Sequence, residues 1–207
     1  MTDKEKQHSG ALYQPLDPQI LEEQLVLLDT LREYNAIPHV RPDLREAKLR
    51  EMFAAVGENC YIESPFYANF AGRHVRLGKN VYANFGLTLV DDTDIDIGDY
   101  TMIGPNVTIA TAGHPIDPDL RRKGLQYNLP VRVGRNCWLG AGTVVLPGVT
   151  IGDDTVIGAG SVVTKDIPAG VVAVGNPCRV MREVGERDRK FYYRNLPIDP
   201  SEFESAE

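Results

Sequence analysis

The stretch VRVGRNCWLGAGTVVLPGVTIGDDTVIGAGSVV, residues 131–163, carries an aliphatic residue at every sixth position. These anchor residues are Val133, Leu139, Val145, Ile151, Ile157 and Val163. A period of six fits neither an α-helix, which repeats about every 3.6 residues, nor a single amphipathic strand, which alternates from residue to residue. It fits a solenoid in which short strands are joined by tight turns and each hexad repeats the one before it.

The positions around each anchor are restricted as well. Two residues before an anchor the side chain stays small or β-branched, as at Cys137, Thr143 and Ser161. Glycine directly follows four of the anchors, at Gly134, Gly140, Gly152 and Gly158. Because glycine adopts unusual φ and ψ angles without a steric penalty, we expect these glycines to form the corners of the coil.

The same grid begins upstream of this stretch. Its first anchors are Leu77, Ala83 and Leu89, and after a two-residue offset it resumes at Ile97, Ile103 and Ile109. With three hexads to a coil, these twelve anchors predict four coils, stacked at about 4.8 Å. We therefore expect a mainly β protein in which a parallel β-helix spans residues 58–183.

Residues 110–130 interrupt the grid with prolines, charges and a histidine. We interpret this segment as a loop that protrudes from the coil, not as a strand. Long ordered loops on a repetitive scaffold usually carry function. After the last coil, the tail at 184–207 is expected to hold one short helix and then to fray.

Residues 1–57 are helical in pattern. Asp17-Pro18 is a helix N-cap followed by proline at the first helical position, and apolar residues then recur at three- and four-residue spacing. A second helix is predicted from Pro42 through Val56, ended by Gly57. We expect the two helices to cap one end of the solenoid, where strand edges are otherwise unpaired.

Composition limits the possible partners. The formal charge of −7 and pI near 5.2 argue against binding nucleic acid or an anionic membrane. Cys60, Cys137 and Cys178 are far apart and odd in number, so we expect buried thiols and neither a disulfide framework nor a zinc site. The N-terminus is polar and no apolar run reaches membrane-spanning length, which predicts a cytoplasmic protein.

Taken together, the hexads and the segments YANFGLTLVDD, ATAGHPID, NCWLGAGTVVLPGVTIG and GSVVTKDIPAGVVAVGNPCRV resemble the hexapeptide-repeat sugar O-acetyltransferases, in particular the galactoside and maltose O-acetyltransferases. Hexads are shared by acyltransferases of many specificities, whereas the segments around Asn84, Asp92 and His114 are more specific. The resemblance implies a left-handed parallel β-helix. It also implies a homotrimer with active sites between subunits, and acetyl-CoA as co-substrate.

His114 is the expected catalyst. Acetyl transfer from a thioester to a sugar hydroxyl needs one base to remove the alcohol proton, which an imidazole does near neutral pH. The alternative is a loop histidine that only bonds a backbone carbonyl. The resemblance favours the catalytic role, because the family's catalytic histidine has the same Gly-His-Pro context. His39 and His74 are expected to be structural or exposed, and His8 disordered.

The resemblance also implies an acceptor site, formed by Asp17, Asn69, Tyr82, Asn84 and Asp92. An amide fixes a sugar hydroxyl by donating and accepting, and a carboxylate accepts two hydrogen bonds. Each assignment has an alternative: a left-handed solenoid corner for Asn84, a solvated acidic loop around Asp92, and a simple helix cap for Asp17.

Some positions depart from the galactoside pattern. Gln24 stands where an arginine is common, and Gln126 where the galactoside type has methionine. The strand YANFAGRHVRLG, residues 67–78, which contains Asn69, is one residue longer than usual, and this leaves the match of Asn69 open. These departures bear on which sugar is bound and not on the catalytic histidine.

For coenzyme A the resemblance implies a set in the last coils: Trp138, Ala141, Ala159, Thr164, Lys165, Arg179 and Arg182. Cations hold phosphates, and exposed solenoid backbone pairs with the amides of the pantetheine arm. The alternatives are solvated surface charges for the basic residues and packing for Trp138. Ala141 stands where several members have serine, which is neutral if the contact uses the backbone N–H.

These observations predict an acetyl-CoA-dependent acetyltransferase that modifies a galactoside-type sugar, at the 6-hydroxyl by family analogy. Acceptors of maltose or glucose type, or an antibiotic, are alternatives within the same fold, and a non-catalytic trimeric scaffold is the alternative outside enzymes. No metal is expected, because no cluster of Asp, Glu, His or Cys has ligand spacing.

Overall fold

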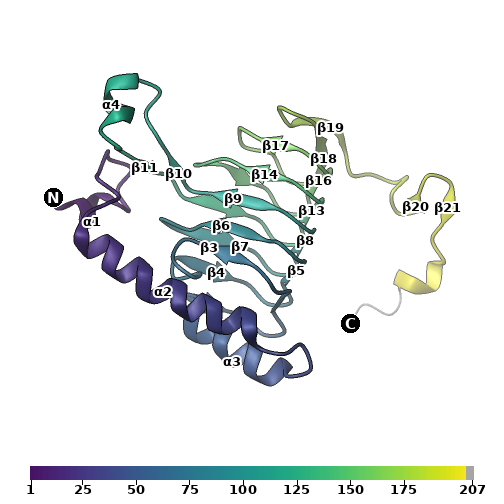
Figure 1. Ribbon diagram of the computed structural model, residues 1–207. Helices are drawn as coiled ribbons and strands as arrows, with labels where there is room; N and C mark the ends of the chain where they lie inside the picture. Colours follow the sequence, from purple (N-terminus) through teal and green to yellow (C-terminus); the bar gives the residue numbers. More distant parts are fainter. Residues whose placement is uncertain (204–207) are drawn as a thin grey trace.

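The computed structural model describes residues 1–203 and shows a parallel β-solenoid whose coils have three sides (Figure 1). The first face contains β1 (Ala55–Val56), β4 (Val75–Leu77), β7 (Ile95–Ile97), β12 (Val131–Val133) and β15 (Thr150–Ile151). The second contains β2 (Tyr61–Ile62), β5 (Tyr82–Ala83), β8 (Met102–Ile103), β13 (Trp138–Leu139), β16 (Val156–Ile157) and β18 (Val171–Val174), with β19 (Arg179–Glu183) added antiparallel. The third contains β3 (Tyr67–Ala68), β6 (Thr88–Val90), β9 (Thr108–Ala110), β14 (Val144–Val145) and β17 (Val162–Val163).

The predicted grid is confirmed, but four coils is an undercount. The anchors pair in register from coil to coil, for example Leu77 with Ile97, Ile97 with Val133 and Val133 with Ile151. A further coil precedes them, because β1, β2 and β3 pair with β4, β5 and β6. Another follows, in which Ile167 bridges to Ile151 and β18 pairs with β16. The solenoid therefore has about six coils.

The interior explains the small residues that precede the anchors. Thr143 and Ser161 are fully buried beside the aliphatic anchors. Their hydroxyls donate to the carbonyls of Gly140 and Gly158, at 2.7 Å and 2.5 Å. A buried hydroxyl without such an acceptor would be costly. Because each one finds a carbonyl of its own turn, the core tolerates a polar column.

Glycine is required after the anchors for a different reason from the one expected. None of them has a positive φ; in the coil corners that conformation is taken mainly by other residues, among them Asn59, Asn80, Asn106, Asn136, Asp154, Gly142 and Gly160. A Cβ on Gly98 would lie 2.5 Å from the backbone N of Arg135, and one on Gly140 would lie 2.5 Å from that of Ala159. These positions require glycine because the next coil passes too close for any side chain.

This cause can be tested by comparing two Gly→Ala substitutions. Gly98→Ala should lower the free energy of unfolding by about 3 kcal/mol, because its Cβ meets rigid backbone. Gly142→Ala is the control: its φ is +68° but no atom lies within 4 Å, so it should cost only about 1 kcal/mol of left-handed strain. Urea denaturation at one protein concentration measures both. Equal losses would contradict the explanation.

The N-terminal segment forms α1 (Asp3–Lys6), α2 (Pro18–Ala36) and α3 (Pro42–Met52). Asp17 caps α2 as expected, accepting a hydrogen bond from the backbone N of Gln19 at 2.9 Å. The second helix ends at Met52 and does not continue to Val56, which already pairs in the first coil. Helix α2 contacts β3 and α3 contacts β1, so both lie along the first-coil end of the solenoid (Figure 1).

Arg45 fastens α3 to the first coil. It is 1% exposed, and its guanidinium donates to the carbonyls of Ile37 and Ile62 and to the hydroxyls of Tyr34 and Ser64. Four acceptors, from α2, the α2–α3 junction and the first coil, thus converge on one buried side chain. This network stabilises the cap where apolar packing alone would leave buried oxygens without donors.

Two segments leave the solenoid (Figure 1). The interruption contains β10 (Ala112–Gly113), α4 (Pro118–Arg122) and β11 (Tyr127–Asn128), and β10 pairs antiparallel with β11, so it holds short strands that were not expected. The tail contains a hairpin of β20 (Phe191–Tyr193) and β21 (Leu196–Pro197) before the expected short helix, η1 (Pro200–Phe203). The predicted fraying at the very end falls on 204–207, outside the described residues.

Candidate functional site

His114 stands on the protruding loop directly after β10. Its Nδ1 lies 2.8 Å from the carbonyl oxygen of Leu125. A carbonyl only accepts, so Nδ1 carries the proton and Nε2 keeps its lone pair. Gly113 before it must lack a side chain, because a Cβ there would lie 2.7 Å from the ring of Tyr127. The carbonyl bond expected of a merely structural histidine is present, and it leaves the exposed imidazole in the tautomer of a base.

Asp92 lies at the corner where the third face turns into the first, called here the third–first corner. It is 5% exposed, its Oδ2 accepts from Asn69 Nδ2 at 2.8 Å, and its Oδ1 accepts from Gln126 Nε2 at 2.9 Å. The structure thus brings two predicted acceptor residues together and adds Gln126. Neighbouring Asp91 and Thr93 are buried too, so the solvated loop considered as an alternative is wrong for this part of the acidic run.

Asp91 has a structural task at the same corner. Its carboxylate accepts from the backbone N–H groups of Phe70 and Gly72, at 2.8 Å and 2.9 Å. Burial nevertheless raises its pKa to about 6, because the loss of hydration outweighs these two bonds. His8, expected to be disordered, packs here instead, with Nδ1 3.0 Å from the hydroxyl of Thr93 and its ring against His74.

Asp17 uses one carboxylate oxygen for the helix cap. That oxygen, Oδ1, receives the backbone N–H of Gln19, and the side chain is half-buried. Within residues 1–203 the other oxygen has no hydrogen-bond partner. The cap therefore leaves one oxygen available for a ligand.

Asn84 lies at the other end of the third face, at the second–third corner. Its backbone is not left-handed, which removes the corner explanation for the residue. Its Oδ1 accepts from the backbone N of Phe85 at 2.7 Å, and no partner for Nδ2 is found in the described part of the chain. One strand and its turns separate Asn84 from Asp92, on the order of 15 Å.

Ala141 and Ala159 stack on this same second–third corner in later coils. Gly160 donates its backbone N–H to the carbonyl of Ala141 at 2.8 Å, which places the two turns directly above one another. The backbone N–H groups of Ala141 and Ala159 find no acceptor among residues 1–203. Two free donors one coil apart are thus presented along the edge.

The outer side of the second face carries a row of exposed apolar side chains. Tyr82, Met102 and Trp138 are consecutive partners in the ladder and are 37%, 52% and 53% exposed. Trp138 is therefore not part of the core. Neither Trp138 nor Tyr82 lies near His114, because the loop that carries His114 leaves the solenoid at the third–first corner. The row borders the edge that holds Asn84, Ala141 and Ala159.

The residues predicted to bind the coenzyme phosphates differ in whether their side chains already make hydrogen bonds within the protein. Thr164 and Lys165 lie at the third–first corner of a later coil, and Lys165 is exposed. Arg179 donates to the carbonyl of Cys178 at 2.7 Å. Arg182 makes a two-pronged pair with Asp188 at 2.7 Å and 2.8 Å, and this pair lowers the pKa of Asp188 to about 2.

The predicted site residues consequently form two groups within one chain. The third–first group comprises Asn69, Asp92, Thr164 and Lys165, with His114 on the loop that leaves this corner and Asp17 on the N-terminal segment, which bridges to that loop through Tyr13 and Gln14. The second–third group, with the adjoining second face, comprises Tyr82, Asn84, Trp138, Ala141, Ala159, Arg179 and Arg182. The third face lies between them. Sequence reasoning missed Gln7, Tyr13 and Asn128, which join Gln126 near Asp92. Only the polar alternation of Gln126 and Asn128 around Tyr127 could have indicated them.

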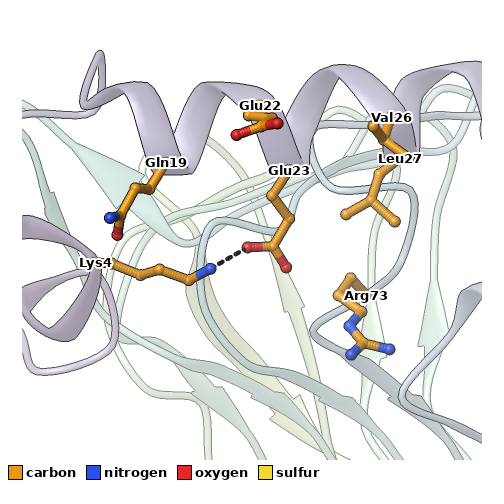
Figure 2. A pocket seen from close by; sticks show the side chains of 7 residues that line it. All are labelled: Lys4, Gln19, Glu22, Glu23, Val26, Leu27 and Arg73. Atoms are coloured by element: carbon orange, nitrogen blue, oxygen red, sulfur yellow. Dashed lines mark ion pairs between the residues drawn. The ribbon is translucent and has the colours of Figure 1, made fainter.

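A cavity of about 570 Å³ lies elsewhere, between α1, α2 and Arg73 (Figure 2). The Lys4–Glu23 ion pair, 2.9 Å long, crosses it, and Val26 and Leu27 line one side. None of the predicted site residues lines this cavity. Within residues 1–203 there is no cluster of three His, Cys, Asp or Glu able to hold a metal ion, and no helix has the length and apolar character needed to cross a membrane.

Comparison with known proteins agrees with this architecture. Residues 130–165 match the family described as bacterial transferase hexapeptide (six repeats), and residues 6–57 match the maltose acetyltransferase hexapeptide capping motif. The galactoside O-acetyltransferase of Lactococcus lactis subsp. lactis (strain IL1403) is 52% identical over 196 residues, which cover 95% of each chain. That of Escherichia coli (strain K12) is 44% identical over 197 residues, covering 95% of this chain and 97% of its own.

Solved structures of related proteins show the same architecture. A galactoside acetyltransferase in complex with coenzyme A matches with a TM-score of 0.93 at 43% identity, over 96% of this chain and 99% of its own. A maltose O-acetyltransferase from Clostridium difficile 630 matches with a TM-score of 0.87 at 44% identity, over 90% and 99%. The chain is an acyltransferase built on hexapeptide repeats. It belongs to the galactoside and maltose O-acetyltransferase family.

Proposed function

We propose that this acetyltransferase moves the acetyl group of acetyl-CoA to the 6-hydroxyl of a galactoside-type sugar, with His114 as general base. The observation that carries this proposal is the bond between Nδ1 of His114 and the Leu125 carbonyl, which leaves Nε2 free to accept a proton. The galactoside O-acetyltransferase names of the relatives, and the coenzyme A bound to the matched structure, support the substrates.

The reaction needs no covalent enzyme intermediate. Nε2 of His114 takes the proton of the sugar hydroxyl while that oxygen attacks the thioester carbonyl carbon. The carbon–sulfur bond then breaks, and the coenzyme thiolate leaves and receives the proton from the imidazolium. Asp92 and the free oxygen of Asp17 accept hydrogen bonds from other sugar hydroxyls, and the Asn84 amide orients the reacting one.

Acetyl-CoA is proposed to lie along the second–third corner. The free N–H groups of Ala141 and Ala159, one coil apart, suit carbonyl oxygens of the pantetheine arm. If these contacts use main chain, alanine at position 141 costs nothing. Arg179 and Arg182 supply charge for the phosphates from the same chain, and Arg182 would share its guanidinium with Asp188. Lys165, at the third–first corner, would supply charge from a neighbouring copy.

The site is proposed to form between subunits of a homotrimer. His114 and Asp92 occupy one corner while Asn84 and Ala141 occupy another, so a single chain holds only parts of the machinery. A second copy placed against the exposed row at Tyr82, Met102 and Trp138 would bring the two corners together. We further propose a cytoplasmic enzyme, which agrees with three unpaired thiols.

Maltose or glucose is the second candidate acceptor. It is favoured by the maltose-type capping motif at residues 6–57 and by the similarity to a maltose O-acetyltransferase. Comparing kcat/KM for a galactoside, glucose, maltose and a hydroxylated antibiotic separates these possibilities from one another.

Replacing the base should remove turnover and spare coenzyme binding. We expect His114→Ala to lower kcat by roughly 10²–10⁴-fold, because only the proton acceptor is lost. The coenzyme A Kd, measured by calorimetry, should stay within about twofold. His39→Ala, which removes another exposed histidine, is the control and should keep full activity. Wild-type turnover by His114→Ala would overturn the mechanism.

Mixing two inactive variants tests the shared site. His114→Ala and Asn84→Ala should each be inactive as pure proteins. When they are co-refolded in equal amounts, about a quarter of the interfaces in a cyclic trimer join two intact halves, so about a quarter of wild-type activity should return. If the mixture stays inactive although mixed oligomers form, both residues act within one chain.

A further inference from the structure

A buried polar network surrounds the carboxylate of Asp92. Nε2 of Gln126 lies 2.9 Å from Asp92 Oδ1, 2.7 Å from the hydroxyl of Tyr13 and 2.9 Å from Asn128 Oδ1. Asn128 donates in turn to the Tyr13 hydroxyl and to the backbone carbonyl of Gln7, at 2.9 Å and 2.8 Å. All five side chains are at least nine-tenths buried. The chemistry proposed above uses none of these amides.

The same short segment also holds the base. Leu125, whose carbonyl fixes Nδ1 of His114, directly precedes Gln126. Gln126 is clamped by a two-way backbone bridge, in which its N–H donates to the Tyr13 carbonyl at 3.0 Å and its own carbonyl accepts from Tyr13 at 2.9 Å. A single step along the chain therefore separates the group that orients the imidazole from the group that orients the carboxylate.

We propose that Gln126 is a positioning residue for acetyl transfer. Held by its backbone bridge to Tyr13, Gln126 orients the Asp92 carboxylate toward the acceptor sugar, and the adjoining Leu125 carbonyl orients the His114 imidazole. This inference rests on the proposed function, because it takes Asp92 as an acceptor ligand and His114 as the base. It adds that the N-terminal segment, through Tyr13 and Gln7, sets the relative position of the two.

The physical reason is that a carboxylate with few hydrogen-bond partners can rotate, and a rotated carboxylate makes poorly aligned hydrogen bonds to the sugar hydroxyls. Oδ1 receives its amide hydrogen bond from Gln126, whereas Oδ2 receives one from Asn69. Removing the first donor leaves a buried oxygen without its partner and frees one rotation. The acceptor should then bind more weakly, and acetyl-CoA, held by other residues, should bind as before.

Two substitutions at this position distinguish positioning from simple packing. Gln126→Leu keeps the size and removes the donors, so the acceptor KM should rise roughly tenfold with an unchanged KM for acetyl-CoA. Gln126→Glu places a second carboxyl against Asp92. When protonated it still donates, and when ionised it repels Asp92, because two carboxylates sharing a site do not both ionise readily.

The ratio of kcat/KM for Gln126→Glu to that of the wild type should therefore fall about tenfold as the pH rises from about 5.5 to 8, whereas the ratio for Gln126→Leu should stay flat. The other titratable groups facing the network are Tyr13, whose pKa burial raises to about 12, Asp91, His8 and His114. These groups are present in every variant, so the ratio to wild type cancels their common effect.

Gln14→Leu is the matched control. Gln14 also joins the N-terminal segment to the loop, through a 3.0 Å bond from Nε2 to the Lys123 carbonyl, but it does not touch Asp92. It should leave both KM values and the pH ratio unchanged. If Gln14→Leu and Gln126→Leu have equal effects, or the Gln126→Glu ratio is flat with pH, the positioning role is wrong.

Asp92→Asn and His114→Ala separate this failure from failure of the proposed function. If they lower acceptor kcat/KM and turnover while the Gln126 variants behave as wild type, the proposed function stands and the positioning role is wrong. If Asp92→Asn and His114→Ala both keep wild-type kinetics, the proposed function itself is wrong. Thermal unfolding of each variant identifies any that fails to fold, and Gln126→Glu assayed at low pH then serves as its folded counterpart.

Discussion

The backbone ladder between coils is the constraint on which the structure depends. The N–H of Gly98 donates to the carbonyl of Val133 and that of Gly134 to the carbonyl of Ile151, at 2.9 Å and 2.8 Å. This ladder fixes the rise per coil near 4.8 Å. At the corner a Cβ on Gly98 or Gly134 would then meet the next coil at 2.5 Å, so glycine is required. Inside the solenoid, the same rise places each aliphatic anchor directly above the equivalent anchor of the neighbouring coil. One aliphatic anchor per hexad is therefore enough to fill the core.

A regular interior of this kind leaves chemistry to the places where the ladder is broken or exposed. At the second–third corner the N–H groups of Ala141 and Ala159 have no hydrogen-bond acceptor within residues 1–203. At the third–first corner the chain leaves the solenoid to form the loop at residues 110–130. There, polar side chains make hydrogen bonds in place of the interrupted backbone ladder. Asp91 accepts two backbone N–H groups there, and Gln126 and Asn128 tie the returning strand to the corner. Buried polar groups at this corner therefore serve both the fold and the proposed site.

The sequence predicted the repeat well because anchors such as Val133 and Ile151 have no freedom in spacing. It missed the first coil because that coil has weaker anchors: Val56, Ile62 and Ala68 also lie six residues apart, but Val56 follows directly on a helical pattern. The glycine pattern was visible while its cause was not, since close approach between coils is a three-dimensional fact. Asn69 and Asp92 were identified through family resemblance, and the structure joins them by a hydrogen bond.

The polar network around Asp92 lay beyond sequence reasoning for another reason. Gln7, Tyr13 and Asn128 are separated by up to 121 residues along the chain, and their spacing gives no local pattern that predicts contact with Asp92. Their meeting depends on the N-terminal segment crossing the base of the loop, which no local pattern encodes. Hydrogen-bonding side chains that converge from three distant segments become interpretable only when the fold is known.

The shape of the solenoid also explains why the proposed site needs more than one chain. Flat faces around a filled core offer little concave surface, and ligand sites are concave. The loop bearing His114 supplies one wall, held by the carbonyl of Leu125. The opposite wall is expected to be the second–third corner of another copy, beside the exposed Tyr82 and Trp138. A closed ring of identical chains sets one such corner against every loop, because each interface repeats the same contact.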